Sequence, residues 1–232
     1  MWAVAVGLLA TAGLLGAWRR SGLPLFDLTA LHAFRAYARL WHGVPRRGTR
    51  QLPAKGPALL IANHTCSADP AILQTCCPRP LCFLIAREYY HLPVARRFFG
   101  HFGMVPVARN GRDITALRVG LRRLAEGRVV CLFPEGGLSG AGTGRVRPGR
   151  GGAALLALRS GAPVYPAFIA GGPQHSHIAR AWLLPSRARV VVGEPVDLSA
   201  YRDRPLDRRL IEEVAALLMR RVAELDPNRR HP

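Results

Sequence analysis

From residue 57 onward, short apolar runs alternate with stretches in which apolar residues recur at helical spacing. The runs predict strands at Ala58–Ala62, Leu81–Ala86, Val129–Phe133, Val164–Ile169 and Arg189–Val192. The stretches between and after them predict helices near Pro70–Cys76, Ile114–Glu126, Gly152–Ser160 and Leu206–Leu225. Such alternation is typical of an α/β domain with a mostly parallel sheet flanked by helices, here expected over residues 46–232.

The chain begins with an apolar stretch, Trp2–Trp18, that contains no charged residue and is followed at once by Arg19 and Arg20. As a helix it would span ~26 Å, close to the ~30 Å of a hydrocarbon core. A signal peptide carries its positive charges before the apolar run. Residues 1–22 are therefore expected to form an uncleaved hydrophobic membrane anchor, and a buried soluble helix is the alternative. The arginines favour a domain on the cytoplasmic face of the inner or cytoplasmic membrane.

Helical periodicity continues in residues 23–45. Apolar positions there include Leu28, Leu31, Phe34, Tyr37, Ala38 and Trp41, and the positions between them include His32, Arg35, Arg39 and His42. This pattern predicts an amphipathic interfacial helix with a basic polar face, part of an N-terminal membrane-associated helical segment. The alternative is a helix that packs on the domain and leaves its basic side in solvent.

Basic residues outnumber acidic ones by 33 to 14, which gives a formal net charge of +19. Such a charge attracts anionic partners, including lipid head groups, phosphorylated substrates and acyl carriers. Few aromatic residues accompany the basic ones, so a nucleic-acid partner is not expected. The five cysteines form no Cys-x-x-Cys pair, and Cys82 and Cys131 lie in apolar runs, which favours free thiols in a reducing compartment.

A histidine and an aspartate follow the first predicted strand, at His64 and Asp69. A neutral imidazole can take a proton from an attacking hydroxyl near neutral pH. A carboxylate five residues later can fold back to orient that imidazole and stabilise its protonated form. The alternatives are an incidental loop histidine, and an Asp69 that caps the helix beginning with Pro70.

Three further segments carry candidate binding residues. Arg109 ends a short apolar run and offers a forked guanidinium to phosphate. Gly136 and Gly137 follow Glu135 just past a strand, where they form either an anion-binding nest or a simple turn. The same glycine-rich loop contains three more guanidiniums, those of Arg145, Arg147 and Arg150. The run that contains Val164 and Pro166 is apolar throughout, so it predicts a buried strand or the lining of an acyl pocket.

In this order, the segments resemble the phospholipid/glycerol acyltransferase family over about residues 40–200. The best-known members of that family are lysophosphatidic acid acyltransferases. Its motif His-x-x-x-x-Asp is matched by His64 and Asp69, and the arginine after a Pro-Val pair by Arg109. The motif Phe-Pro-Glu-Gly-Thr-Arg-Ser is matched in part by Phe133–Ser139, and the Val-x-Pro strand by Val164 and Pro166.

The resemblance implies a His–Asp dyad that activates a lyso-glycerolipid hydroxyl to attack acyl-CoA or acyl carrier protein directly. It implies no metal, no cofactor and no covalent acyl-enzyme. The second and third motifs, with Arg109, Glu135, Gly136 and Gly137, would hold the phosphate of the acceptor. Gly137 and Leu138 stand where the family has Thr and Arg. Either a loop arginine supplies the missing charge, or the acceptor differs from lysophosphatidic acid.

Other functions are compatible with parts of this pattern. An acyltransferase of the same family with another acceptor would use glycerol 3-phosphate, a lysophospholipid or a lyso-aminolipid. A hydrolase would need Cys66 or Ser67 as its nucleophile, and neither lies in a nucleophile-elbow sequence. A non-catalytic basic lipid-binding protein would explain the charge but not the His–Asp pair.

Overall fold

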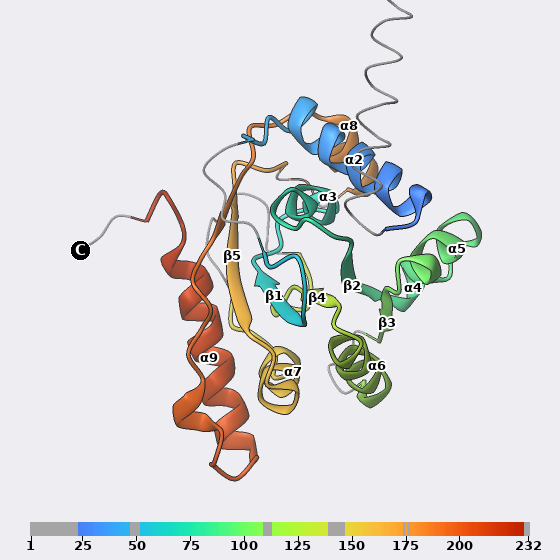
Figure 1. Cartoon of the computed structure of the whole chain (residues 1–232). Coiled ribbons are helices and arrows are strands. Elements are labelled where there is room, and N and C mark those ends of the chain that lie inside the picture. The colour runs from blue at the N-terminus through green and yellow to red at the C-terminus, as the bar shows by residue number, and fades with distance from the viewer. Residues whose placement is uncertain are drawn as a thin grey trace, which may run out of the picture.

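The computed structural model describes residues 23–46, 52–108, 113–138, 147–173, 175 and 177–229. Within these residues, six strands form one sheet with helices on both faces (Figure 1). The strands are β1 (Ala58–Ala62), β2 (Leu81–Ala86), β3 (Val105–Val107), β4 (Val129–Leu132), β5 (Val164–Ala170) and β6 (Arg189–Val192). The α-helices are α2 (Leu25–Leu40), α3 (Asp69–Leu73), α4 (Arg87–Tyr90), α5 (Pro93–His101), α6 (Ile114–Ala125), α7 (Gly152–Ser160), α8 (Ile178–Leu183) and α9 (Arg208–Glu224).

The strand order is β3-β2-β4-β1-β5-β6. Strands β1 to β5 are parallel, and β6 runs antiparallel to β5. The predicted mostly parallel sheet flanked by helices is therefore confirmed. The edge strand β3 was not predicted as a strand, because it has only three residues and Pro106 at its centre. Proline cannot donate to a sheet ladder, so it is tolerated at an edge such as this one.

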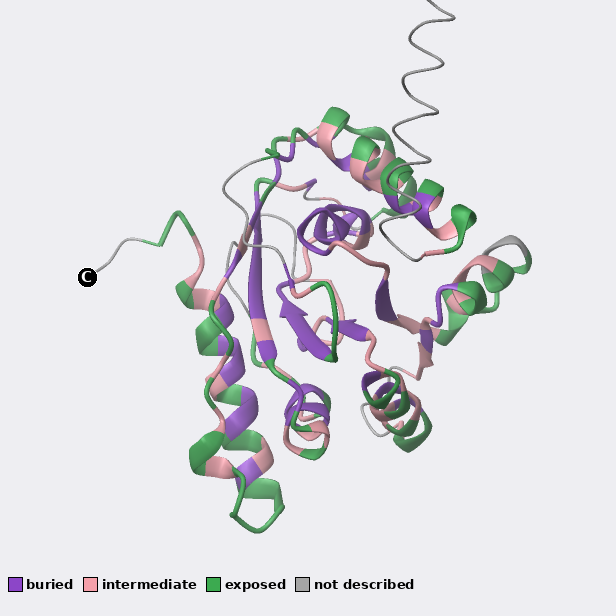
Figure 2. Cartoon of the chain, in the orientation of Figure 1, coloured by how far each residue is buried: buried purple, intermediate pink, exposed green. Residues whose placement is uncertain are grey.

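Strand β1 is buried along its whole length and shares its side chains between two apolar clusters (Figure 2). Leu60 faces the cluster formed with residues of α2, α3 and the 3₁₀ helix Gln74–Cys76. Leu59 and Ile61 face the opposite cluster, formed with α6, α7 and α9. Burial on both faces explains why the sequence of β1 is continuously apolar instead of alternating.

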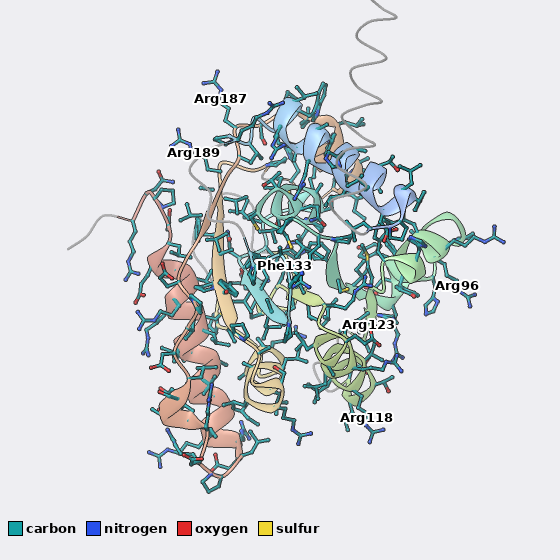
Figure 3. All side chains as sticks on the ribbon, in the orientation of Figure 1. Arg96, Arg118, Arg123, Phe133, Arg187 and Arg189 are labelled. Atoms are coloured by element: carbon teal, nitrogen blue, oxygen red, sulfur yellow. The ribbon has the colours of Figure 1, made fainter. Side chains whose placement is uncertain are left out.

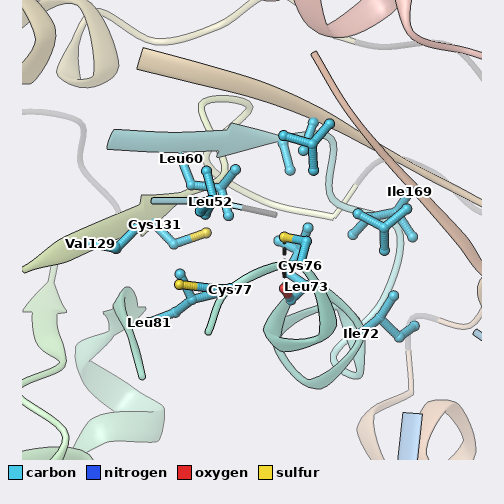
Figure 4. Close-up of a cluster of buried hydrophobic side chains, with 14 of the residues drawn as sticks. Leu52, Leu60, Ile72, Leu73, Cys76, Cys77, Leu81, Val129, Cys131 and Ile169 are labelled. Atoms are coloured by element: carbon cyan, nitrogen blue, oxygen red, sulfur yellow. Dashed lines mark hydrogen bonds between the residues drawn. The ribbon is translucent and has the colours of Figure 1, made fainter. Parts of the chain in front are cut away.

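The cysteines behave as the sequence predicts, since all five are free and buried. Arginines, by contrast, lie at the surface of the domain, and Figure 3 shows Arg96, Arg118, Arg187 and Arg189 reaching outward. Figure 4 shows Cys76, Cys77 and Cys131 among aliphatic side chains of the first cluster. Burial raises the pKa of the Cys77 thiol to about 11, so the thiol is neutral at physiological pH.

Helix α2 packs on the domain through the apolar face that the sequence assigns to the membrane interface. Leu28, Leu31 and Ala38 are buried, and Ala38 belongs to the first core cluster. The guanidinium of Arg35 donates to the carbonyls of Gln74 and Cys77 across that contact. The alternative of a helix packed on the domain therefore describes α2, and the predicted domain boundary at residue 46 stays a prediction. An apolar stripe alone does not reveal whether protein or lipid covers it.

The predicted membrane anchor, residues 1–22, lies outside the described residues. In the part of the chain that the structure describes, no helix combines the length and the apolar character needed to cross a bilayer.

Candidate active site

Two loops meet at the carboxyl edge of the sheet because β1 and β4 are parallel neighbours. Ile61 of β1 is in register with Leu132 of β4, so the residues after both strands emerge side by side. The loop after β1 is fixed at its start by Asn63, whose side-chain amide donates to the carbonyl of Ile169 and accepts from its N–H. These bonds of 3.0 and 2.7 Å hold the loop after β1 against β5 as well.

His64 and Asp69 form a hydrogen-bonded pair in the loop after β1. Nδ1 of His64 lies 2.9 Å from Oδ2 of Asp69, so a neutral imidazole with its proton on Nδ1 donates to the carboxylate. Within the described chain, Nε2 of His64 has no hydrogen-bond partner, and the side chain is 19% exposed. This arrangement leaves Nε2 with a lone pair for a proton from outside the protein.

The imidazole of His64 is also held by an aromatic ring. Phe133, the first residue after β4, stacks on it with ring centroids 3.9 Å apart and planes 9° from parallel. The ring of Phe83 stacks in turn on Phe133, with ring centroids 6.2 Å apart. The stack restricts rotation of the imidazole and so preserves the alignment of Nδ1 with Asp69.

The carboxylate of Asp69 is completely buried and organises the loop. Its Oδ2 accepts from the backbone N–H groups of Thr65 and Cys66, at 2.6 and 3.0 Å. Its Oδ1 accepts from the Thr65 hydroxyl at 3.1 Å and from the Cys66 thiol at 3.3 Å. The N-cap of α3 is Ala68, without a side-chain cap, so the helix-capping alternative for Asp69 does not describe this structure.

The two nucleophiles that a hydrolase would need are both engaged elsewhere. Cys66 is buried, and its pKa is raised, first by desolvation and next by the charge of Asp69, so it does not form a thiolate near neutral pH. The hydroxyl of Ser67 donates to the carbonyl of Ile178 at 3.1 Å. The geometry of the loop therefore disfavours a covalent mechanism through Cys66 or Ser67.

Glu135 joins the loop after β4 to the backbone of His64. Its side chain is fully buried, and Oε1 accepts from the N–H of His64 at 3.0 Å. Its Oε2 accepts from both the backbone N–H and Nε of Arg147, each at 3.3 Å. The contacts of Glu135 are thus those of a residue that positions the dyad, and its predicted role in substrate binding stays a prediction.

Two loop arginines lie against the turn at Gly136 and Gly137. Arg147 donates to the carbonyl of Gly137 at 2.8 Å, and the Arg150 side chain passes over Gly136. The Gly136 N–H donates to the carbonyl of Phe133 at 3.1 Å, which closes a turn. This bond is the one expected of a simple turn, and the predicted role of Gly136 and Gly137 in phosphate binding stays a prediction.

Gly136→Ala tests the packing of Arg150 on this turn. Gly136 has φ +69°, and an added Cβ would lie 2.4 Å from Nε of Arg150. Gly127 is a matched control, because it has φ +75° and open space where its Cβ would be. Both alanine variants should lose about 1–2 kcal/mol of unfolding free energy from left-handed strain. Only Gly136→Ala should also displace Arg150, measured as a further loss of stability in denaturant titrations. Equal losses would show that the Arg150 contact contributes nothing.

Four predicted site residues remain, of which the structure describes two. Arg109 and Arg145 lie outside the described residues. Val164 is in register with Leu59, near the start of β1 and away from His64, and it packs in the core beneath α7 and α9. Pro166 is buried in the middle of β5. No contact of this pair supports the predicted acyl pocket.

Sequence reasoning missed the positioning roles of Phe133, Asn63 and Thr65. Phe133 was assigned to the end of a strand, whereas β4 ends at Leu132 and the ring of Phe133 lies against His64 in the site. The signal available in the sequence was its position directly before the Pro134-Glu135 turn.

The chain resembles known proteins over most of its length. Residues 44–170, more than half of the chain, match the protein-family model described as Acyltransferase. A 1-acyl-sn-glycerol-3-phosphate acyltransferase of Bacillus subtilis (strain 168) is 23% identical over 196 residues, covering 84% of this chain and 94% of that protein. An enzyme of the same name from Borreliella burgdorferi is 26% identical over 124 residues, covering 53% of this chain and 49% of that protein.

A solved structure has the same fold. The crystal structure of the 1-acyl-sn-glycerophosphate (LPA) acyltransferase PlsC from Thermotoga maritima superposes with a TM-score of 0.67 at 20% identity. The match covers 97% of this chain and 94% of that one.

Proposed function

Because this chain belongs to the acyltransferase family, whose model matches residues 44–170, we propose that it acylates the hydroxyl of a lysophosphatidic acid-type acceptor in phospholipid biosynthesis. The acyl donor is a thioester, either acyl-CoA or acyl carrier protein. The observation that carries the proposal is the His64–Asp69 pair, with Nδ1 bound to the carboxylate at 2.9 Å and Nε2 left for a substrate.

The reaction needs one general base and no covalent intermediate. Nε2 of His64 takes the proton of the acceptor hydroxyl as its oxygen attacks the thioester carbonyl. Asp69, buried and held by Thr65 and Cys66, stabilises the imidazolium that forms. The tetrahedral intermediate then collapses, the C–S bond breaks, and the proton on Nε2 passes to the departing thiolate. The products are the ester and the free thiol.

A phosphorylated acceptor is supported by the charge beside the dyad and by the relatives. Arg147 and Arg150 lie on the turn that follows Phe133, whose ring stacks on His64. Arg147 is half exposed even though it pairs with Glu135. The relatives from Bacillus subtilis and Borreliella burgdorferi are both named as 1-acyl-sn-glycerol-3-phosphate acyltransferases. Leu138, in place of the usual arginine, is the observation that favours a different acceptor of the same family.

The test compares acceptors that differ in their phosphate, acyl chain or head group. The purified full chain is given labelled acyl-CoA or acyl carrier protein with 1-acylglycerol 3-phosphate, 1-acylglycerol, glycerol 3-phosphate or a lysophospholipid. We expect acylation of 1-acylglycerol 3-phosphate and little of 1-acylglycerol. If no acceptor is acylated the proposal fails. If only glycerol 3-phosphate or a lysophospholipid is acylated, Leu138 marks a change of acceptor.

Arg150→Gln should weaken the use of the phosphorylated acceptor specifically. A charge-assisted contact to phosphate contributes roughly 1.5–3 kcal/mol, equivalent to about 10- to 150-fold in kcat/KM. Arg159→Gln is the matched control, because Arg159 is an exposed arginine in the last turn of α7. An equal loss with phosphorylated and unphosphorylated acceptors would show that Arg150 supports the turn without binding phosphate.

A further inference from the structure

An apolar surface patch lies where the end of α2 meets α8. Leu40 is 85% exposed and Leu183 is 70% exposed, and Trp41 and Leu184 beside them are also exposed. The N–H of Ser186 donates to the carbonyl of Trp41, which places the residues after α8 directly against the end of α2. Figure 1 shows the two helices side by side at the top of the molecule. We call Leu40, Trp41, Leu183 and Leu184 the α2–α8 patch.

A partly buried hydrogen-bond chain joins the end of α2 to α8 and so holds the patch as one unit. The Tyr37 hydroxyl donates to the carbonyl of Trp182 at 2.6 Å, so it accepts from Nε2 of His42 at 2.9 Å. Nδ1 of His42 then accepts from the hydroxyl of Ser186 at 3.0 Å. His42 is fully buried, and desolvation lowers its pKa, which keeps the neutral form that this chain of bonds requires.

The same unit supports the loop that holds the dyad. Ala181 of α8 packs with Cys66 and Ala68 in a small buried cluster, and Trp182 lies against it. The hydroxyl of Ser67 donates to the carbonyl of Ile178 at the start of α8. Residues on one side of α8 therefore contact the His64–Asp69 loop, while Leu183 is exposed at its end.

The charges around the α2–α8 patch have a single sign. Residues 28–68 and 136–193, which contribute α2 after its first turn, α8 and the segments after them, contain no aspartate or glutamate. The exposed residues on these segments include Arg46, Arg180 and Arg187, each within five residues of the patch along the chain. Leucine and tryptophan surrounded by arginine match the boundary between acyl chains and anionic head groups. A second copy of the chain would bring like charges together, which disfavours a symmetric dimer through this surface.

From these observations we infer that the α2–α8 patch docks on the surface of an anionic lipid bilayer and holds the dyad loop at that surface. The occupant is a membrane, with Leu40 and Leu183 among the acyl chains and the arginines among the head groups. The inference rests on the proposed function in taking the acceptor to be a membrane lipid. It assigns the contact with lipid to α8, a helix whose sequence is only six residues long and was not predicted.

A fluorescent label on the full chain tests the docking directly. All five native cysteines are buried, so Leu183→Cys provides one accessible thiol for an environment-sensitive dye. The matched control is Leu206→Cys, which exposes a thiol in the loop before α9, at the opposite end of the molecule in Figure 1. With phosphatidylglycerol vesicles, the label at position 183 should shift to shorter wavelength and be quenched by spin-labelled acyl chains. The label at position 206 should keep its aqueous spectrum.

Three results would overturn the inference. The first is that the label at position 183 keeps its aqueous spectrum although the protein sediments with the vesicles. The second is that the label is shielded from iodide in the absence of vesicles, which would mean that another part of this chain covers the patch. The third is that the spectrum of the label changes with protein concentration alone, which would mean that a second copy of the chain covers the patch. The spectra require no turnover, so they separate this inference from the proposed reaction, which is measured by acylation of the acceptors.

Discussion

The His64→Ala protein is expected to lose about 10²–10⁴ in kcat, the range that general-base catalysis contributes. The removed imidazole presents its Nε2 without a hydrogen-bond partner within the described chain, at the junction of the β1 and β4 loops. Its loss leaves the fixed framework of the site intact, because Asp69 keeps its contacts to Thr65 and Cys66. Single-turnover assays with labelled thioester measure the change in the chemical step.

A second histidine provides the control for this substitution. His177 is an exposed residue just before α8, so His177→Ala should retain activity. Thermal unfolding of both variants should stay close to that of the parent chain, since the ring of His64 is partly exposed. A His64→Ala protein that folds and turns over at near-normal rate would remove His64 from the mechanism.

Much of the fold can be predicted from the sequence because strands buried on both faces are continuously apolar. The bounds of β1, β2 and β6 agree with the predicted runs, and α7 begins and ends where its periodicity does. The prediction is less accurate where the pattern is short. Strand β3 has three residues and α8 has six, too few to show a period.

The face of α2 shows a different limit of the sequence. Its apolar positions are correctly identified, but Leu28 and Leu31 contact protein where lipid was expected. Leu40 and Trp41, at the end of the helix, do reach solvent, and their setting depends on α8, well over a hundred residues later. A local pattern cannot reveal a partner so distant in sequence.

The candidate site likewise combines a local contact, which the sequence predicts, with contacts between distant residues, which it does not. The spacing of His64 and Asp69 predicts their pairing because a five-residue turn is local. The contacts of Glu135 depend on the pairing of β1 with β4, which brings together residues 71 positions apart. Sequence reasoning therefore identified Glu135 as a site residue but not its contacts with His64 and Arg147, and its predicted role in substrate binding stays a prediction.

Asp69→Asn is expected to reduce kcat by up to about 10⁴, the loss found when the carboxylate partner of a catalytic histidine is replaced by its amide. The amide nitrogen can only donate, so it cannot receive the hydrogen bonds that now come from His64, Thr65 and Cys66. If the amide instead donates to Nδ1, the histidine proton moves to Nε2, and that nitrogen can no longer take a proton from the acceptor.

The same substitution should also destabilise the fold, which allows the two roles of Asp69 to be separated. Buried donors without an acceptor cost about 1–3 kcal/mol, to be measured by denaturant titration. Asp207→Asn is the control, because Asp207 caps α9 through the N–H of Leu210 and asparagine caps a helix as well as aspartate does. Asp207→Asn should therefore leave both stability and rate unchanged. An Asp69→Asn protein that loses stability but keeps its rate would show that Asp69 only holds the loop, and that His64 acts without a carboxylate partner.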